Sequence, residues 1–116
     1  MTAEWQGRIV GKNARVGKAR DGHLYAREPY VDFRRALAWT FRAARRGKLD
    51  GPVSVRLEYD LDPARDLDSA ITVTFDALED SGIIDDDNQI ARLLVVRRTH
   101  ARGEMDTVRI AVEETN

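Results

Sequence analysis

Residues 65–90 read RDLDSAITVTFDALEDSGIIDDDNQI, and this stretch decides the fold because a single helix separates two groups of carboxylates. Its apolar residues recur at helical spacing, which predicts a helix over 68–81. Asp66 and Asp68 lie at the approach to this helix, and residues 85–87 are three consecutive aspartates that follow it. Like charges this close raise one another's pKa values and resist sharing a site. The pattern therefore indicates a bound divalent cation and a metal-dependent enzyme.

Strand and helix patterns surround this stretch. Alternating or continuous apolar residues predict strands over 4–10, 53–60, 90–98 and 107–113. A first helix is expected from Pro29 to about residue 46, with Phe33, Leu37 and Phe41 forming its buried stripe. The segment 11–26 is rich in glycine and basic residues and is expected to be a mobile loop with a short strand at 23–25. The prediction is an α+β fold, a mixed β-sheet with two packed α-helices.

The composition limits the class of protein. The chain has 116 residues, which suits one domain over 1–116, and 42% apolar with 34% charged residues is typical of a globular protein. Cysteine is absent, which excludes disulfides, zinc–thiolate sites and thiol catalysis. No apolar run approaches the roughly 20 residues that span a bilayer, and no signal peptide opens the chain. A cytoplasmic protein without membrane contact is therefore expected.

The net charge of −1 conceals an asymmetry along the chain. Residues 1–50 carry twelve Lys or Arg against five Asp or Glu, whereas residues 51–87 carry two against eleven. A polyanion can lie on the basic part while a cation sits in the acidic part. The alternative is that the two blocks only pair with each other as surface charges.

Each acidic group also has a purely structural interpretation. In an extended segment Asp66 and Asp68 point to the same side and can face one metal ion, but Asp68 can instead cap the helix. Consecutive aspartates also favour ordinary solvated turns. The two ends of a 13-residue helix are about 20 Å apart, so the second group must return along the sheet to reach the first. Spacing alone does not show that it does. Calcium binding of the EF-hand type is not expected, because the loop pattern and its distal Glu are missing.

Four segments follow one another in a fixed order: RDLD at 65–68, FDAL at 75–78, SGI at 81–83 and DDNQI at 86–90. This series resembles the signature of the RusA-type Holliday junction resolvases (crossover junction endodeoxyribonucleases), in which D-x-D-N is followed by a helix with D-A-L, a glycine and D-D-x-Q-[IV]. A weaker resemblance extends to Lys12-Asn13 and to residues 22–37. The specific match covers residues 65–90.

The resemblance implies a small bacterial or phage homodimer of α+β fold that cuts branched DNA, the four-way junction, with Mg²⁺ or Mn²⁺. Asp66, Asp68 and Asp87 match the metal ligands and Asp86 a supporting catalytic acid, whereas Asp85 has no such counterpart and is expected to be an ordinary turn residue. Ser69 replaces the asparagine of the pattern. Thr72 stands where the family commonly has a catalytic lysine, and threonine supplies no charge to the phosphate. A catalytically impaired junction-binding protein is therefore the alternative function, and an acidic adaptor without metal or DNA preference is a third.

Basic residues are expected to hold the phosphate backbone of the DNA. The candidates are Lys12, Arg15, Lys18 and Arg20 of the basic loop, with Arg97 and Arg98 at the end of the long strand. His23 and His100 are both expected in surface loops without a role. Tyr25 and Tyr30 are expected to pack structurally, with base stacking as the alternative.

Overall fold

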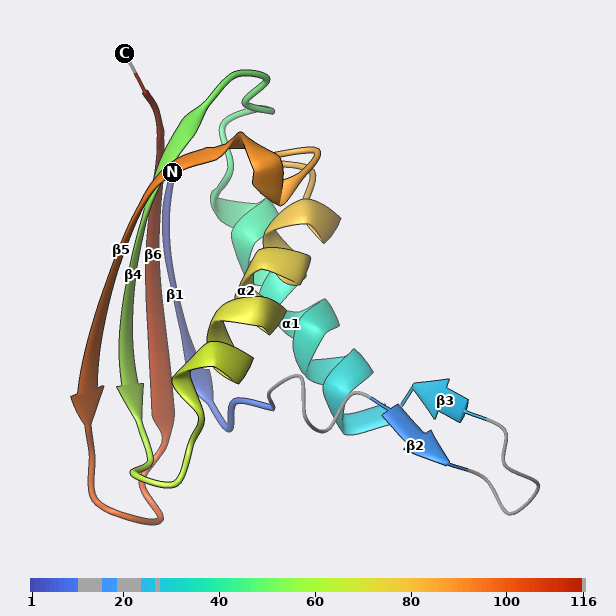
Figure 1. The fold of residues 1–116 in the computed structure, drawn as a ribbon, viewed down its shortest axis with the longest axis vertical. Coiled ribbons are helices and arrows are strands. Elements are labelled where there is room, and N and C mark those ends of the chain that lie inside the picture. The colour runs from blue at the N-terminus through green and yellow to red at the C-terminus, as the bar shows by residue number, and fades with distance from the viewer. Residues whose placement is uncertain (11–15, 19–23, 27, 116) are drawn as a thin grey trace.

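The computed structural model describes residues 1–10, 16–18, 24–26 and 28–115. Its main feature is a four-stranded mixed sheet in the order β1-β6-β4-β5 (Figure 1). The elements, in chain order, are β1 Thr2–Gly7, β2 Val16–Lys18, β3 Leu24–Ala26, α1 Glu28–Ala44, β4 Val53–Leu61, α2 Leu67–Asp80, the 3₁₀ turn η2 Asp87–Gln89, β5 Ile90–Thr99 and β6 Asp106–Glu114. β2 and β3 form a separate antiparallel pair.

Strand β4 organises the sheet, because it pairs with β5 in parallel and with β6 in antiparallel orientation. Its side chains alternate between fully buried and more exposed, as the period of two in its sequence predicts. The parallel pairing requires a crossover between β4 and β5, and α2 provides it. Both helices lie against the same face of the sheet, and no other described element covers the opposite face (Figure 1).

The core forms between this sheet face and the two helices. In α1 the predicted stripe of Phe33, Leu37 and Phe41 is at most 5% exposed. The buried Tyr59 of β4 connects the layers, because its hydroxyl lies 2.7 Å from Thr74 Oγ1 on α2. Burial against this core stabilises each large apolar side chain by about 1.5–3 kcal/mol.

The predicted mixed sheet with two packed helices is confirmed, and element boundaries shift by a few residues. The first strand covers 2–7 rather than 4–10. Ile9 lies beyond it and is buried, and its N–H donates to Asp106 instead of to a strand. Most of the expected basic loop, with the loop residue His23, lies outside the described residues.

Candidate functional site

Asp66 is the residue that caps α2. Its Oδ1 accepts from the Asp68 N–H at 3.3 Å and its Oδ2 from the Ser69 hydroxyl at 2.9 Å. The interpretation of Asp68 as the cap is therefore wrong, because Asp68 lies inside the first helical turn. The two aspartates also do not share one extended segment, since the chain turns into the helix between them. Each carboxylate is still exposed at the positive end of the helix dipole.

Thr72 lies one turn after Asp68 on the same helix. Its hydroxyl donates to the Asp68 carbonyl oxygen at 3.0 Å, a bond within the helix that brings no charge to this end of α2. Thr72 is only half-buried. A longer side chain at this position therefore has room to extend along the helix towards Asp68.

A second acidic group lies at the other end of α2. One ligand atom from each of Glu79, Asp86 and Asp87 lies within 4.8 Å of the others. Among the residues that the structure describes, no other group of three or more possible metal ligands converges in this way. The Asp87 N–H donates to Glu79 Oε1 at 2.9 Å, which fixes the turn against the helix. Sequence reasoning found the two aspartates but missed Glu79. Its spacing of three residues from Asp76 on one helical face was the available signal.

The carboxylates of this group destabilise one another's charged forms. Partial burial raises the pKa of Asp87, with a hydrogen bond to Asp86 and the charges of Asp86 and Asp76 adding to the effect. Burial is also the main cause that raises the pKa of Glu79, and the charges of Asp87, Asp86 and Asp76 add to it, whereas the hydrogen bond from the Asp87 N–H lowers it. A divalent cation among these oxygens would relieve the repulsion.

Gln89 holds the acidic turn in place. Its Oε1 accepts from the N–H groups of Asp85 and Asp86 at 2.7 and 3.4 Å. Its Nε2 donates to the carbonyl oxygens of Leu49 and Gly51 at 2.8 and 3.0 Å. One side chain thus ties the acidic turn to the segment that leads into β4.

Two further contacts border the acidic turn. Asp85 forms an ion pair with Lys48 at 2.7 Å and so has a structural partner. On the α1 side, the buried Tyr30 donates from its hydroxyl to Asp76 Oδ2 at 2.9 Å. Tyr30 therefore packs structurally, whereas the Tyr25 side chain lies outside the described atoms.

The structure does not bring the two acidic groups together within one chain. Asp66 and Asp68 lie at the start of α2, and Asp86 and Asp87 lie beside Glu79 in its last turn. A helix of 14 residues is about 20 Å long, which is far beyond the reach of ligands to one metal ion. The return of the second group along the sheet, on which a site within one chain depends, does not occur.

The predicted DNA-binding residues are placed unevenly. Lys12, Arg15 and Arg20 lie outside the described residues, and of Lys18 only the backbone in β2 is described. Arg98 is exposed on β5, beside Asp60 of β4. Arg97 instead donates from Nη2 to the carbonyl oxygens of Asp62 and Arg65 at 3.3 and 3.0 Å, so part of its guanidinium stabilises the chain.

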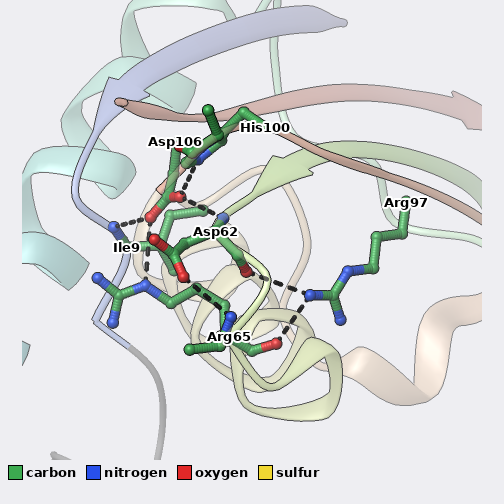
Figure 2. Close-up of polar contacts among 8 residues, drawn as sticks. Ile9, Asp62, Arg65, Arg97, His100 and Asp106 are labelled. Atoms are coloured by element: carbon green, nitrogen blue, oxygen red, sulfur yellow. Dashed lines mark hydrogen bonds and ion pairs between the residues drawn. The ribbon is translucent and has the colours of Figure 1, made fainter. Parts of the chain in front are cut away.

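His100 corrects the expectation of two surface histidines. Its side chain is only 5% exposed, and its Nε2 lies 2.7 Å from Asp106 Oδ1. Figure 2 shows that this pair lies beside Asp62 and Arg65, in the connection that leads to Asp66. Sequence reasoning could not pair two residues that meet only because the turn between β5 and β6 folds back.

Comparison with known proteins identifies the protein family. Among the described residues, no helix combines the length and the apolar composition that crossing a membrane requires. A search of curated proteins finds no match to the chain. A family model described as endodeoxyribonuclease RusA matches residues 6–113, nearly the whole length. With its α+β architecture of a mixed sheet and two helices, the chain belongs to the RusA endodeoxyribonuclease family.

Proposed function

We propose that this protein is a Mg²⁺-dependent, structure-selective endodeoxyribonuclease that resolves four-way DNA junctions by symmetric cuts. Membership of the RusA family carries the proposal. The converging carboxylates of Glu79, Asp86 and Asp87 support it, because such crowding is costly unless a cation is bound. Under this proposal the chain acts as a single domain. It cleaves junction DNA in the cytoplasm of a bacterium or of a phage-infected cell.

The donor atoms suit a hard cation. Carboxylate oxygens are the ligands that Mg²⁺ and Mn²⁺ prefer, and the described side chains here offer no softer donor. Asp87 and Glu79 would bind the ion from the last turn of α2, with Asp86 beside them. Asp66 and Asp68, at the start of α2, would supply further carboxylate ligands. A bound Mg²⁺ would supply the Lewis acidity and the oriented water that phosphodiester hydrolysis needs.

We infer that the active site is completed by a homodimer. Two acidic groups about 20 Å apart on one helix cannot serve one ion within a chain. In a two-fold dimer the start of α2 from one protomer can face the end of α2 from its partner, and symmetry then creates two such sites. Two equivalent sites suit a substrate in which two strands are cut symmetrically.

The free edge of β5 supports an association surface. β5 ends the sheet order, so among the described strands it pairs with β4 alone. Leu93 and Leu94 of this strand are 45% and 53% exposed, on opposite faces. A long edge with exposed leucines invites pairing or packing with another chain. A second copy would cover these leucines.

DNA contact is assigned to the basic residues Lys12, Arg15, Lys18, Arg20, Arg97 and Arg98. Arg98 is exposed, whereas Arg97 also anchors the connection before α2. Charge neutralisation on substituting Arg98 should weaken junction binding and reduce its salt dependence. The loop residues would act in the same way.

The test is cleavage of a labelled four-way junction in Mg²⁺ and in Mn²⁺, beside a linear duplex of the same sequence. The wild type should make paired cuts in the junction only, and Asp68→Asn and Asp87→Asn should bind the junction in Ca²⁺ without cutting it. Cuts that persist in both variants would refute the assigned ligands. Absence of both binding and cutting would favour the acidic adaptor.

Thr72 supports the second candidate function, a junction-binding protein with impaired catalysis. The position brings a hydroxyl rather than an ammonium group next to Asp68. If the wild type binds junctions but does not cut them, Thr72→Lys should restore cleavage, because a lysine can stabilise charge that develops on the phosphate. Thr72→Met, of similar length without charge, is the matched control and should not restore it.

A further inference from the structure

Asp106 is a buried carboxylate with four donors around it (Figure 2). Its Oδ1 accepts from the Asp62 N–H at 3.0 Å and from His100 Nε2 at 2.7 Å. Its Oδ2 accepts from the Ile9 N–H at 3.0 Å and from Arg65 Nε at 3.3 Å. The donors come from the segment after β1, from the β4–α2 connection and from the β5–β6 turn. One side chain thus ties three parts of the chain together.

The surroundings of His100 favour its protonated form. Nε2 faces Asp106 Oδ1, and Nδ1 lies 2.7 Å from the Ala101 carbonyl oxygen. A carbonyl oxygen has no hydrogen to give, and the Asp106 carboxyl, whose pKa is lowered, offers an acceptor oxygen as well. Both ring nitrogens therefore face acceptors, an arrangement that favours the imidazolium form of His100. The carbonyl of Ala101 and the carboxylate of Asp106 raise the pKa of His100, as does the Asp60 charge from β4.

The connection 62–65 is held from two sides. Asp106 binds the N–H of Asp62 and the side chain of Arg65, and Arg97 of β5 donates to the carbonyl oxygens of both residues. Asp66, the N-cap of α2, follows directly. Movement of this connection would carry the cap and the first turn with it.

We propose that His100 and Asp106 are positioning residues, which hold the connection 62–65 and thereby aim the carboxylates of Asp66 and Asp68. The inference rests on the proposed function only where it treats these two aspartates as metal ligands. The protonated His100 strengthens the clamp, because its charge-assisted hydrogen bond is stronger than a neutral one. Loss of such a supporting partner commonly weakens metal affinity by about 10- to 100-fold.

The test compares the wild type with His100→Gln, which removes the charge, and with His100→Lys, which keeps a cationic donor. Glu4→Gln is the control, because it removes an exposed ion pair with Arg109 on the far side of the sheet. Two quantities are measured between pH 6 and 9. They are the amide hydrogen exchange of residues 62–70 and the Mg²⁺ concentration at half-maximal junction cleavage.

His100→Gln should accelerate exchange in 62–70 and raise the Mg²⁺ midpoint by about tenfold, with junction binding in EDTA unchanged. In the wild type both quantities should move towards those of His100→Gln as the pH rises through the raised pKa of His100. His100→Lys should remove this pH dependence, which a merely structural contact would not do.

The proposal is overturned if amide exchange in 62–70 is the same in His100→Gln as in the wild type. It is also overturned if the Mg²⁺ midpoint of His100→Gln equals that of the control Glu4→Gln. If His100→Gln does not fold, the wild type at pH 9 is compared with His100→Lys, and equal exchange overturns the proposal. A wild type that never cleaves refutes the proposed nuclease instead, and the exchange measurement still decides whether His100 holds the connection.

Discussion

Glu79 lies where three carboxylates converge, and its charge opposes folding when no cation is bound. Glu79→Gln should raise the free energy of unfolding in EDTA by about 0.5 kcal/mol. The reason is that one repelling charge is lost while the side chain still accepts from the Asp87 N–H. The substitution should also reduce the rise in melting temperature that Mg²⁺ produces, since a ligand stabilises the state that binds it. Thermal denaturation in EDTA and in Mg²⁺ measures both effects.

The control for this comparison is Glu113→Gln, which neutralises an exposed carboxylate of β6 outside the group of Glu79, Asp86 and Asp87. It should leave the Mg²⁺-dependent rise unchanged. An undiminished rise in Glu79→Gln would mean that Glu79 does not bind the ion.

His100 should make stability depend on pH in a direction that its raised pKa determines. The folded protein holds the proton more tightly than the unfolded chain, whose histidine titrates near pH 6.5. The stabilisation is therefore complete below about pH 6.5 and is lost as the pH rises through the folded pKa. The difference in melting temperature between wild type and His100→Gln should be largest near pH 6 and shrink towards pH 9. A difference that grows with pH would contradict the assignment.

Asp106 acts in the opposite pH range. Burial alone would raise its pKa, but the hydrogen bonds from Ile9, His100 and Asp62, together with the nearby charge of Arg65, outweigh burial and lower it. Asp106 therefore stabilises the fold fully at a pH above its pKa in the unfolded chain. This stabilisation is lost as the pH falls through its lower pKa in the folded protein. Asp106 and His100 together thus stabilise the folded state most in the pH range in which Asp106 is ionised and His100 is protonated.

Single residues were predictable where a local rule applies. The stripe of α1 and the aspartates around α2 follow from periodicity and from charge crowding. Glu79 was within reach of the same rule for helical faces. The pairing of His100 with Asp106 was not, because it depends on how the β5–β6 turn folds back. No local pattern encodes that path.

At the scale of an element, α2 combines capping and the candidate ligands at one end. Asp66→Asn should leave stability nearly unchanged, because asparagine caps as well as aspartate. Asp66→Ala should cost about 1 kcal/mol through loss of the cap. Both should abolish cleavage if Asp66 binds the metal, since each removes the carboxylate. Urea denaturation and junction cleavage separate the two roles. Wild-type cleavage by Asp66→Asn would leave Asp66 with the cap alone.

Element types were predictable from periodicity, and element ends were less so. α2 was expected over 68–81 and covers 67–80, because the capping choice between Asp66 and Asp68 decides its first residue. The first strand begins and ends earlier than its apolar residues suggest. Ile9 packs in the core while its N–H donates to Asp106 and not to a strand, a distinction that hydropathy does not carry.

At the scale of the whole molecule, a site shared between two protomers can be tested by mixing inactive variants. Asp68→Asn and Asp87→Asn should each be inactive alone. In a mixed dimer one site would carry both substitutions and the other would carry neither. Mixing should therefore restore single-strand nicks in the junction. In an equal mixture, up to about half of the dimers would contain one intact site. Gel separation of nicked and resolved products measures it.

Sites built within one chain would give no activity on mixing, because every site would keep one substitution. Leu94→Lys is the companion variant, since a charge on the β5 edge should prevent association. Sedimentation should then show a monomer, and the melting temperature should fall because the stabilisation by association is lost. The sequence predicted the carboxylates, whereas their separation by the length of α2 emerged only from the fold.

The position of β6 has a consequence for how the protein is made. This last strand lies between β1 and β4, so the first strand pairs only with the last among the described strands. As the nascent chain leaves the ribosome, β1 emerges with no partner and must wait for β6, which follows about a hundred residues later. Closing such a long loop is slow, and the unpaired strands meanwhile expose apolar surface. Ribosome-associated chaperones should therefore matter for the yield of this protein more than for its final stability.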